Sequence, residues 1–186
     1  MASLVAACLL LCADLAPTIA LCDTEGRTHQ PLAVGDAKAV VLVFTLHDCP
    51  IANRYVQELN RIAEAYEDKG VRLYAVLVDP SLSPEGARTH AEEFEYRFPV
   101  LLDAEHELVK RAKASKTPEA VVYDRTGRIV YRGRIDDRWV RLGKRKQHPD
   151  RLDLRLALDA VLSDREVETP ETEVIGCYIP PMKGNR

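Results

Sequence analysis

Five cysteines, at positions 8, 12, 22, 49 and 177, are the residues most able to do chemistry in this chain. They form no Cys-x-x-Cys pair and no paired metal knuckle, so the sequence does not predict a structural zinc site. If the first thirteen residues were removed by processing, Cys22, Cys49 and Cys177 would remain. An odd number of cysteines cannot be a pure disulfide framework, so at least one thiol is free, buried or reactive.

Cys49 stands between two predicted elements. Residues 39–46 (AVVLVFTL) form a continuous apolar run, which is typical of a strand buried on both faces. Apolar residues then recur every three or four positions over residues 51–68, which indicates an amphipathic helix. Cys49 therefore lies at the first turn of that helix, where unpaired N–H groups and the helix dipole favour a thiolate, and Pro50 suits the first helical position. A buried structural cysteine is the alternative interpretation.

The elements that would position Cys49 follow in order along the chain. Residues 71–79 predict a second strand that lies parallel to the first, with a right-handed crossover through the helix. Ser83 and Pro84 are the N-cap and first residue of another predicted helix. The later predictions are a strand at 98–102, a helix at 105–114, a hairpin of 120–123 with 129–132, and a helix capped by Asp150. This order predicts a single α/β layer sandwich, with Cys22 as a small core residue of an early strand.

Composition narrows the classes of protein. The chain has 186 residues, 46% hydrophobic and 30% charged, which suits one globular domain. A net charge of -3 gives no general reason to expect nucleic acid as a partner. The basic segment 138–146 could instead dock an acidic partner, attract an anionic substrate or stay solvated as a loop.

Residues 1–14 are a candidate export signal or hydrophobic N-terminus. The uncharged apolar run at residues 4–13 is too short to span a bilayer, so we expect no transmembrane span. Its length fits the apolar part of a signal peptide, although no Lys or Arg precedes it. We therefore expect an exported protein, periplasmic or extracellular, and the alternative is a short strand or helix of a cytosolic protein.

Two segments resemble the active-site turn and the Thr-Pro loop of thioredoxin-fold proteins: residues 44–50 (FTLHDCP) and 115–119 (SKTPE). The closer resemblance is to the redoxin group related to alkyl hydroperoxide reductase and thiol-specific antioxidant proteins, over residues 15–180. It implies an α/β, thioredoxin-like fold with a central mixed β-sheet flanked by helices. It also implies a thiol-disulfide oxidoreductase or antioxidant-type redoxin that needs no cofactor. The domain would be residues 15–164, followed by an extended C-terminal tail, residues 165–186, that carries Cys177.

The resemblance implies roles for individual residues. Cys49 matches the nucleophilic thiol, and Pro118 matches the proline that is cis in this fold and lies against that thiol. Thr117 would present backbone polar groups to an extended peptide or a mixed disulfide. The substrate would be a protein dithiol or disulfide, or a peroxide, and the sequence does not indicate the reducing partner.

The chain also departs from the family pattern. Cys49 is followed by Pro50, Ile51 and Ala52 rather than by a second cysteine, so no disulfide can form within the turn. Leu46 stands where peroxidatic sites have Thr or Ser, and Thr45 lies one position further back, which argues against efficient peroxide reduction. His47 as a cation would stabilise a thiolate at Cys49 and Asp48 would oppose it, unless both simply face solvent.

Cys177 is the candidate partner for Cys49. If the tail folds back, Cys177 could resolve a sulfenic acid or mixed disulfide at Cys49. It could equally be an unpaired tail thiol, or bind Cu(I) together with Cys49 and His47. A non-catalytic adaptor that binds an extended peptide near Pro118 is the remaining alternative. The other histidines have no spacing that indicates ligands.

Overall fold

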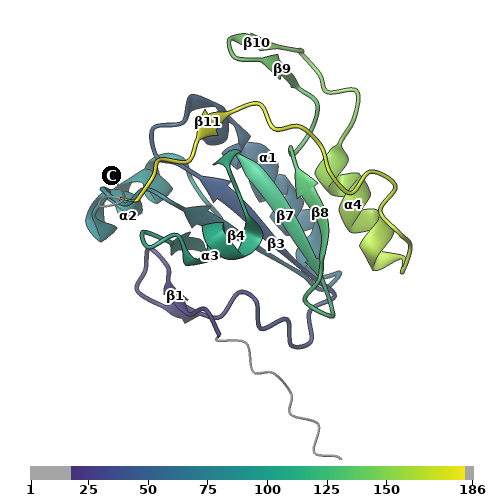
Figure 1. The fold of residues 1–186 in the computed structure, drawn as a ribbon, viewed down its shortest axis with the longest axis horizontal. Helices are drawn as coiled ribbons and strands as arrows, with labels where there is room; N and C mark the ends of the chain where they lie inside the picture. The colour runs from purple at the N-terminus through teal and green to yellow at the C-terminus, as the bar shows by residue number, and fades with distance from the viewer. Residues whose placement is uncertain (1–17, 183–186) are drawn as a thin grey trace, which may run out of the picture.

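The structure, a computed structural model, describes residues 18–182 and is built on one five-stranded sheet (Figure 1). The candidate export signal at residues 1–14 lies outside the described residues. The strand order is β5 (Val100–Leu102), β4 (Val71–Leu77), β3 (Ala39–Thr45), β7 (Glu119–Asp124) and β8 (Ile129–Gly133). β5, β4 and β3 are parallel, whereas β7 and β8 are antiparallel to their neighbours. The predicted α/β class with a central mixed sheet is confirmed.

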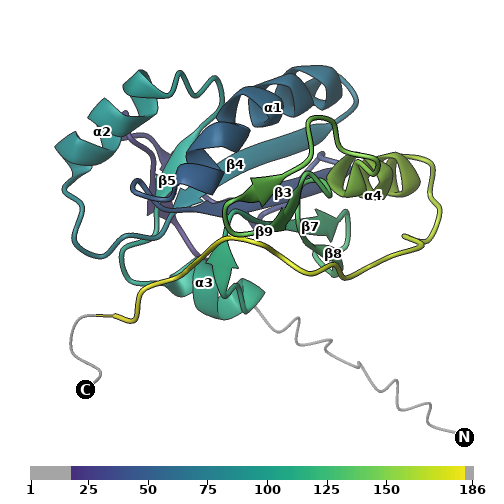
Figure 2. The same ribbon diagram turned by 90° about the horizontal axis from the view of Figure 1, so that it is seen from above.

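Helices cover both faces of this sheet (Figure 2). α1 (Pro50–Glu67) and α4 (Asp153–Leu162) lie next to each other on one face, joined by Arg155 to Glu58 at 2.8 Å and by a hydrogen bond from Tyr66 to Asp159. α2 (Pro84–Glu93) packs beside β5 near the sheet edge, and α3 (Glu107–Ala112) lies on the opposite face. No helix within residues 18–182 is long and apolar enough to cross a membrane.

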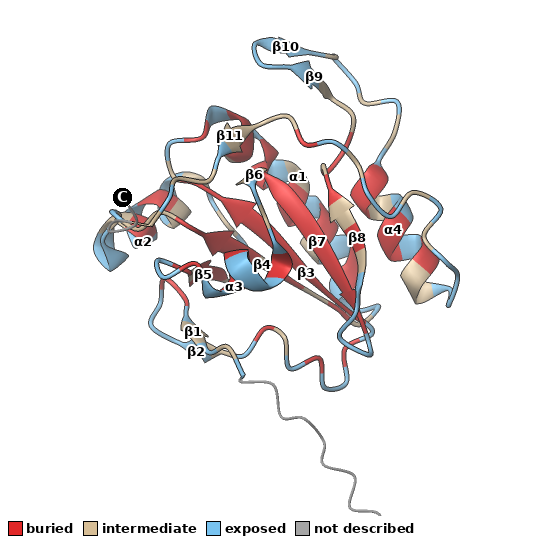
Figure 3. Ribbon diagram, viewed as in Figure 1, coloured by how far each residue is buried: buried red, intermediate tan, exposed pale blue. Residues whose placement is uncertain are grey.

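The centre of the sheet is the most buried part of the molecule, as the red strands of Figure 3 show. Every residue of β3 and of β7 is buried. β3 has β4 and β7 as neighbours and helices above and below it, so both of its faces need apolar side chains. β3 therefore lacks the alternation of apolar and polar residues that is typical of a half-exposed strand, and its sequence is one apolar run.

Two expectations about local structure are wrong. Asp150 does not cap the last helix: α4 begins at Asp153, and the Asp150 carboxylate instead accepts a hydrogen bond from Lys146 at 2.8 Å. Cys22 is exposed rather than part of the core. It belongs to the two-residue strand β1 (Leu21–Cys22), which pairs only with β2 (Thr28–His29) outside the central sheet and so leaves this side chain in solvent.

The basic segment forms a hairpin that projects from the domain at the top of Figure 1. Its strands are β9 (Trp139–Arg141) and β10 (Lys144–Arg145). Trp139 is half-buried and packs against the core, whereas Val140 and Leu142 are exposed. The segment is therefore anchored at its base by its aromatic residue and solvated toward its tip.

The C-terminal segment runs in extended form across the edge of the domain, coloured yellow in Figures 1 and 2. It first follows β8, where the backbone of Arg132 exchanges hydrogen bonds with Pro170 and Thr172 at 2.9 and 3.0 Å. It then ends as β11 (Cys177–Tyr178), which pairs antiparallel with β6 (Lys116–Thr117). Residues 170–178 are therefore held against the domain on both sides of Gly176, rather than extending into solvent.

Candidate active site at the carboxyl end of the central strand

Cys49 lies where β3 passes into α1. Thr45 ends the strand, and Cys49 is the N-cap of the helix, with its N–H donated to the carbonyl of Leu46 at 3.3 Å. Pro50 occupies the first helical position, which needs no N–H donor. No side chain caps this helix, so its first N–H groups remain available to stabilise a negative charge close to the sulfur. The Cys49 side chain itself is fully buried.

The cover over Cys49 includes the loop that carries Thr117 and Pro118. The peptide bond between these two residues is cis, as the resemblance implied. The Cys49 thiol donates a hydrogen bond to the Thr117 carbonyl oxygen, with 3.4 Å between sulfur and oxygen. A helix start and a loop 68 residues later in the chain therefore meet at one sulfur atom.

Cys177 reaches the same place from the C-terminal segment. In the pairing of β11 with β6, Cys177 lies opposite Thr117. The pKa of the Cys177 thiol is raised to about 12, first by burial and then by the interaction with Cys49, with a smaller contribution from the charge of Asp48. Burial therefore keeps Cys177 protonated, and the neighbouring Cys49 acts in the same direction. Both residues are free thiols in this structure.

His47 contacts the carboxyl end of the adjacent strand. Its Nδ1 lies 2.7 Å from Oδ2 of Asp79, and its carbonyl accepts a hydrogen bond from the Asn53 side chain at 2.8 Å. Burial raises the pKa of Asp79, but hydrogen bonds from Ser81 and the charge of His47 outweigh it, so the net change is downward. Asp79 therefore stays ionised, and its carboxylate lies beside an imidazole that is two residues from Cys49 in the chain.

Thr45, which is buried, and Tyr96, which is partly buried, lie in the surroundings of the site. Thr45 is buried at the end of β3. The pKa of Tyr96 is raised to about 12, mainly by burial; the Thr45 hydroxyl opposes the rise and the charge of Cys49 adds to it. The Tyr96 ring lies 6.0 Å from the ring of His90, which in turn lies 6.4 Å from that of His47. Leu46, which follows Thr45 in the chain, is also buried.

Glu119 fixes the shape of the loop before Pro118. It is buried, and its Oε2 accepts the backbone N–H groups of Ser115 at 2.9 Å and Lys116 at 3.2 Å. These two bonds span the residues that lead into Thr117. The carboxylate thus sets the position of the carbonyl that contacts Cys49.

The structure brings the predicted site residues together, from three parts of the chain. They are Thr45, His47, Cys49, Pro50, Thr117, Pro118 and Cys177. Asp79, Tyr96 and Glu119 were not predicted. Asp79 carried a usable signal, because polar residues at the carboxyl ends of neighbouring parallel strands meet at one edge of a sheet. Tyr96 has no local signal, since it enters the site only through packing.

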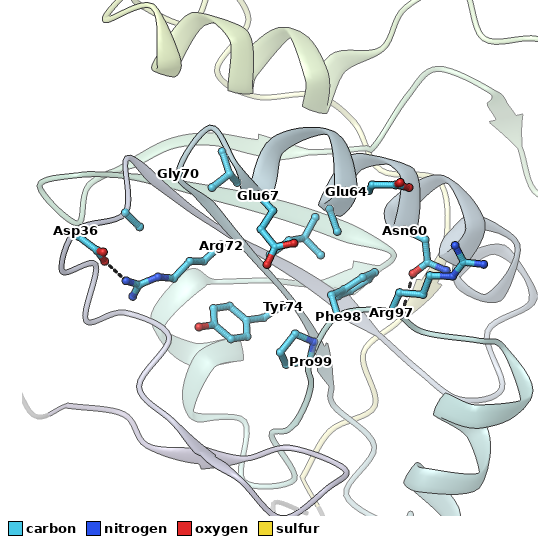
Figure 4. Close-up of a pocket in the computed structure, with 14 residues that line it drawn as sticks. Asp36, Asn60, Glu64, Glu67, Gly70, Arg72, Tyr74, Arg97, Phe98 and Pro99 are labelled. Carbon is cyan, nitrogen blue, oxygen red and sulfur yellow. Dashed lines mark hydrogen bonds and ion pairs between the residues drawn. The ribbon is translucent and has the colours of Figure 1, made fainter.

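A metal centre at this site is not supported, and a groove elsewhere on the domain is separate from it. Among residues 18–182 no group of three or more His, Cys, Asp or Glu side chains could hold a metal ion, so copper binding is not favoured. A groove of about 670 Å³ lies elsewhere, between α1 and the start of β4 (Figure 4). It contains the ion pair of Asp36 with Arg72, and its wall includes Tyr74 and Phe98. None of its lining residues belongs to the cysteine site.

Comparison with known families agrees with this geometry. The family model of AhpC/TSA matches residues 12–132. The chain belongs to the AhpC/TSA family. The matched part ends before the C-terminal segment, so Cys177 lies outside it.

Individual relatives extend the comparison. The chain is 30% identical over 115 residues to the thiol-disulfide oxidoreductase ResA of Geobacillus thermodenitrificans, a match that covers 61% of this chain and 64% of that protein. A hypothetical protein from Sinorhizobium meliloti has a similar structure, with a TM-score of 0.78 and 30% identity over 89% of this chain and 92% of that one. A secreted disulfide oxidoreductase of Mycobacterium tuberculosis, with 16% identity over 79% of this chain and 96% of its own, has a TM-score of 0.55 and shares the fold. The thioredoxin-like fold is thereby confirmed.

Proposed function

We propose that the chain is a thiol-disulfide oxidoreductase in which Cys49 is the nucleophile and Cys177 the resolving thiol. One observation carries the proposal: the pairing of β11 with β6 holds Cys177 opposite Thr117, whose carbonyl accepts the hydrogen bond of Cys49. A thiol at a helix N-terminus is a good nucleophile in the thiolate form. The similarity to ResA, a named thiol-disulfide oxidoreductase, supports the same reaction class.

The reaction proceeds in two thiol-disulfide exchanges. The Cys49 thiolate attacks one sulfur of a substrate disulfide, forms a mixed disulfide and releases the other substrate sulfur as a thiolate that takes up a proton. Cys177 then loses its proton and attacks the Cys49 sulfur, which forms the 49–177 disulfide and releases the second substrate sulfur. The substrate gains two electrons and the protein loses two. An external dithiol restores the two free thiols.

The neighbours of Cys49 support these steps. The N–H groups at the start of α1 stabilise the thiolate, and a protonated His47, 2.7 Å from the Asp79 carboxylate, would add to this. The raised pKa of Cys177 keeps that thiol protonated while Cys49 attacks, so the two sulfurs do not compete for the substrate. Once Cys49 is in a mixed disulfide its charge is gone, and Cys177 ionises more easily.

The first test uses two matched substitutions with a protein disulfide such as insulin as substrate and dithiothreitol as reductant. Cys49→Ser is expected to abolish turnover while the circular dichroism spectrum stays unchanged. Cys177→Ser should accumulate a mixed disulfide at Cys49, visible by peptide mapping under non-reducing conditions. Cys22→Ser, at an exposed position away from the site, is the control. Full turnover of Cys49→Ser would refute the proposal, and peptide binding that survives it would favour the adaptor.

A peroxide is the second candidate oxidant, favoured by the match to the AhpC/TSA model. The Cys49 thiolate would take one peroxide oxygen as sulfenic acid and release an alcohol or water, and Cys177 would then displace water to form the same disulfide. Mild peroxide should convert the two thiols into a 49–177 crosslink that a reductant reverses. A crosslink obtained with disulfides but never with peroxide would restrict the enzyme to disulfides.

We also propose that the protein is exported. The apolar run at residues 4–13 and the fold shared with a secreted disulfide oxidoreductase support this. The intact mass of the protein purified from its native source should lack the first residues. A mass that includes them would contradict export by cleavage.

A further inference from the structure

The C-terminal segment occupies the backbone edge of Thr117 that a substrate would need. Extended peptides are commonly bound by adding a strand to an exposed edge, because their N–H and C=O groups then pair with the protein backbone. At Thr117 that pairing is already made by β11, with Cys177 opposite Thr117 and Tyr178 opposite Lys116. Each backbone group of the edge faces a single partner strand, so β11 and a substrate strand exclude each other.

The part of the segment beside the site is held by polar contacts at its surface and by the partial burial of Cys177 and Ile179 against the core. Lys116 donates to the carbonyl of Val174 at 3.0 Å and lies 5.5 Å from the Tyr178 ring. The N–H of Ile179 donates to the carbonyl of Ser115 at 3.1 Å. Tyr178 is 76% exposed, so its ring buries little apolar surface. Release of this short stretch exposes the partly buried Cys177 and Ile179 but no fully buried side chain, so its cost is small.

The preceding part of the segment is anchored more firmly. The Thr172 hydroxyl lies 2.7 Å from the hydroxyl of Tyr131 and accepts the N–H of Arg134 at 3.0 Å. A Cβ built on Gly133 would lie only 2.1 Å from that hydroxyl, so the two chains are in direct contact there. Residues 176–179 can thus detach and return while Thr172 keeps them close to the site.

Gly176 allows the close approach of the two backbones. A Cβ at this position would lie 1.9 Å from the Thr117 carbonyl oxygen and 2.7 Å from its carbonyl carbon. Both of these are backbone atoms next to the cis-proline, which cannot move aside as a flexible side chain would. A residue other than glycine at 176 must therefore push the segment away from Thr117.

We propose that residues 176–179 are an internal substitute for the substrate strand. Resting on the proposed function, this means that an extended protein disulfide displaces β11 from Thr117 before Cys49 attacks. The exchange at Cys49 is the one written above, with two electrons passing to the substrate. When β11 returns, it takes the Thr117 edge from the bound product strand and brings Cys177 to the mixed disulfide, so resolution and product release are one event.

The experiment measures access to Cys49 rather than turnover. The full-length reduced protein is treated with N-ethylmaleimide, and labelling at Cys49 is followed by peptide mapping, with the exposed Cys22 as an internal reference. Gly176→Ala should raise the rate at Cys49 about tenfold or more without changing the rate at Cys22, because overpacking of this size displaces the segment. Gly143→Ala, on the exposed hairpin, has open space at its Cβ but a φ of +75° that strains an alanine; it controls for a backbone disturbance far from the site and should change neither rate.

A second variant tests the proposal in case Gly176→Ala has a local folding defect. Lys116→Met removes the contacts to Val174 and Tyr178 without introducing a clash, and should raise Cys49 labelling in the same direction by a smaller factor. If both variants label Cys49 at the wild-type rate, the segment does not cover the site and the proposal is overturned. That result would leave the nucleophilic role of Cys49 intact.

Mixed disulfides distinguish the remaining outcomes. With insulin, Gly176→Ala should accumulate the mixed disulfide at Cys49 although Cys177 is still present, because the segment no longer returns to the edge. Rapid formation of the 49–177 disulfide in this variant would contradict the coupling of resolution to strand return. If no variant ever forms a mixed disulfide while Cys49 labelling still rises, the occlusion stands and the proposed function fails.

Discussion

The role of Glu119 as a support for the active-site loop can be tested by removing its carboxylate. Both N–H groups that it binds, those of Ser115 and Lys116, point to the same oxygen, Oε2. Glu119→Ala leaves both without a partner. A polar group left unsatisfied costs about 1–3 kcal/mol, and because Ser115 is exposed we take the lower part of that range. The expected loss of unfolding free energy is about 2–3 kcal/mol.

The matched variant is Glu119→Gln, whose amide oxygen can occupy the place of Oε2. It keeps both hydrogen bonds in neutral form, so it should cost less than about 1 kcal/mol. Urea unfolding measures the free energy of unfolding of both variants. In a thermal melt, the Tm of the alanine variant should lie roughly 4–12 °C below that of the wild type, for a domain of this size. Because the loop carries Thr117, Glu119→Ala should also slow turnover more than Glu119→Gln does. An alanine variant as stable as wild type, within about 0.5 kcal/mol, would refute the assigned support role.

Three further outcomes follow from the same contacts. Cys177 should alkylate slowly below pH 9, since burial and the interaction with Cys49 raise its pKa to about 12. In Cys49→Ser the pH midpoint of Cys177 alkylation should fall. An unchanged midpoint would show that Cys49 does not affect the pKa of Cys177. Burial raises the pKa of Asp124, but hydrogen bonds to Thr126 and Arg128 outweigh this and lower it from 3.8 to about 2. This carboxylate therefore stabilises the folded state above pH 3.8, and that stabilisation is lost as the pH falls toward 2. In Asp124→Asn the free energy of unfolding should depend less steeply on pH over that window. The same slope in the variant and the wild type would contradict this role of Asp124. Thr172→Val should lower the unfolding free energy in urea by about 1–2 kcal/mol, whereas Thr172→Ser keeps the hydroxyl and should not.

The elements around Cys49 were predictable because their signals are local. The apolar run of β3 reflects burial on both faces, and the spacing in α1 reflects one buried face of a helix. Both patterns are complete within a few turns or one strand of chain. The position of Cys49 at their junction follows directly, as does the parallel pairing of β3 with β4.

The start of α4 shows where local signals mislead. Asp150 has the right chemistry for an N-cap, yet its carboxylate bonds Lys146 from the basic hairpin, and the helix begins three residues later. Whether Asp150 caps the helix or pairs with Lys146 depends on where the hairpin lies in the folded domain. The residues around Asp150 in the sequence do not indicate that position. Cys22 is similar: its burial depends on which sheet its short strand joins.

By itself, the sequence determined the α/β class, the strand–helix junction and the cysteine placed at its N-cap, because period and capping chemistry act over short distances. Only the tertiary structure decided that Cys177 stands opposite Thr117, that Glu119 braces the loop and that Tyr96 reaches the site. The segment that carries Cys177 has no periodic pattern. Its path is set by backbone hydrogen bonds to strands far away in the chain, whose partners become known only once the sheet is assembled.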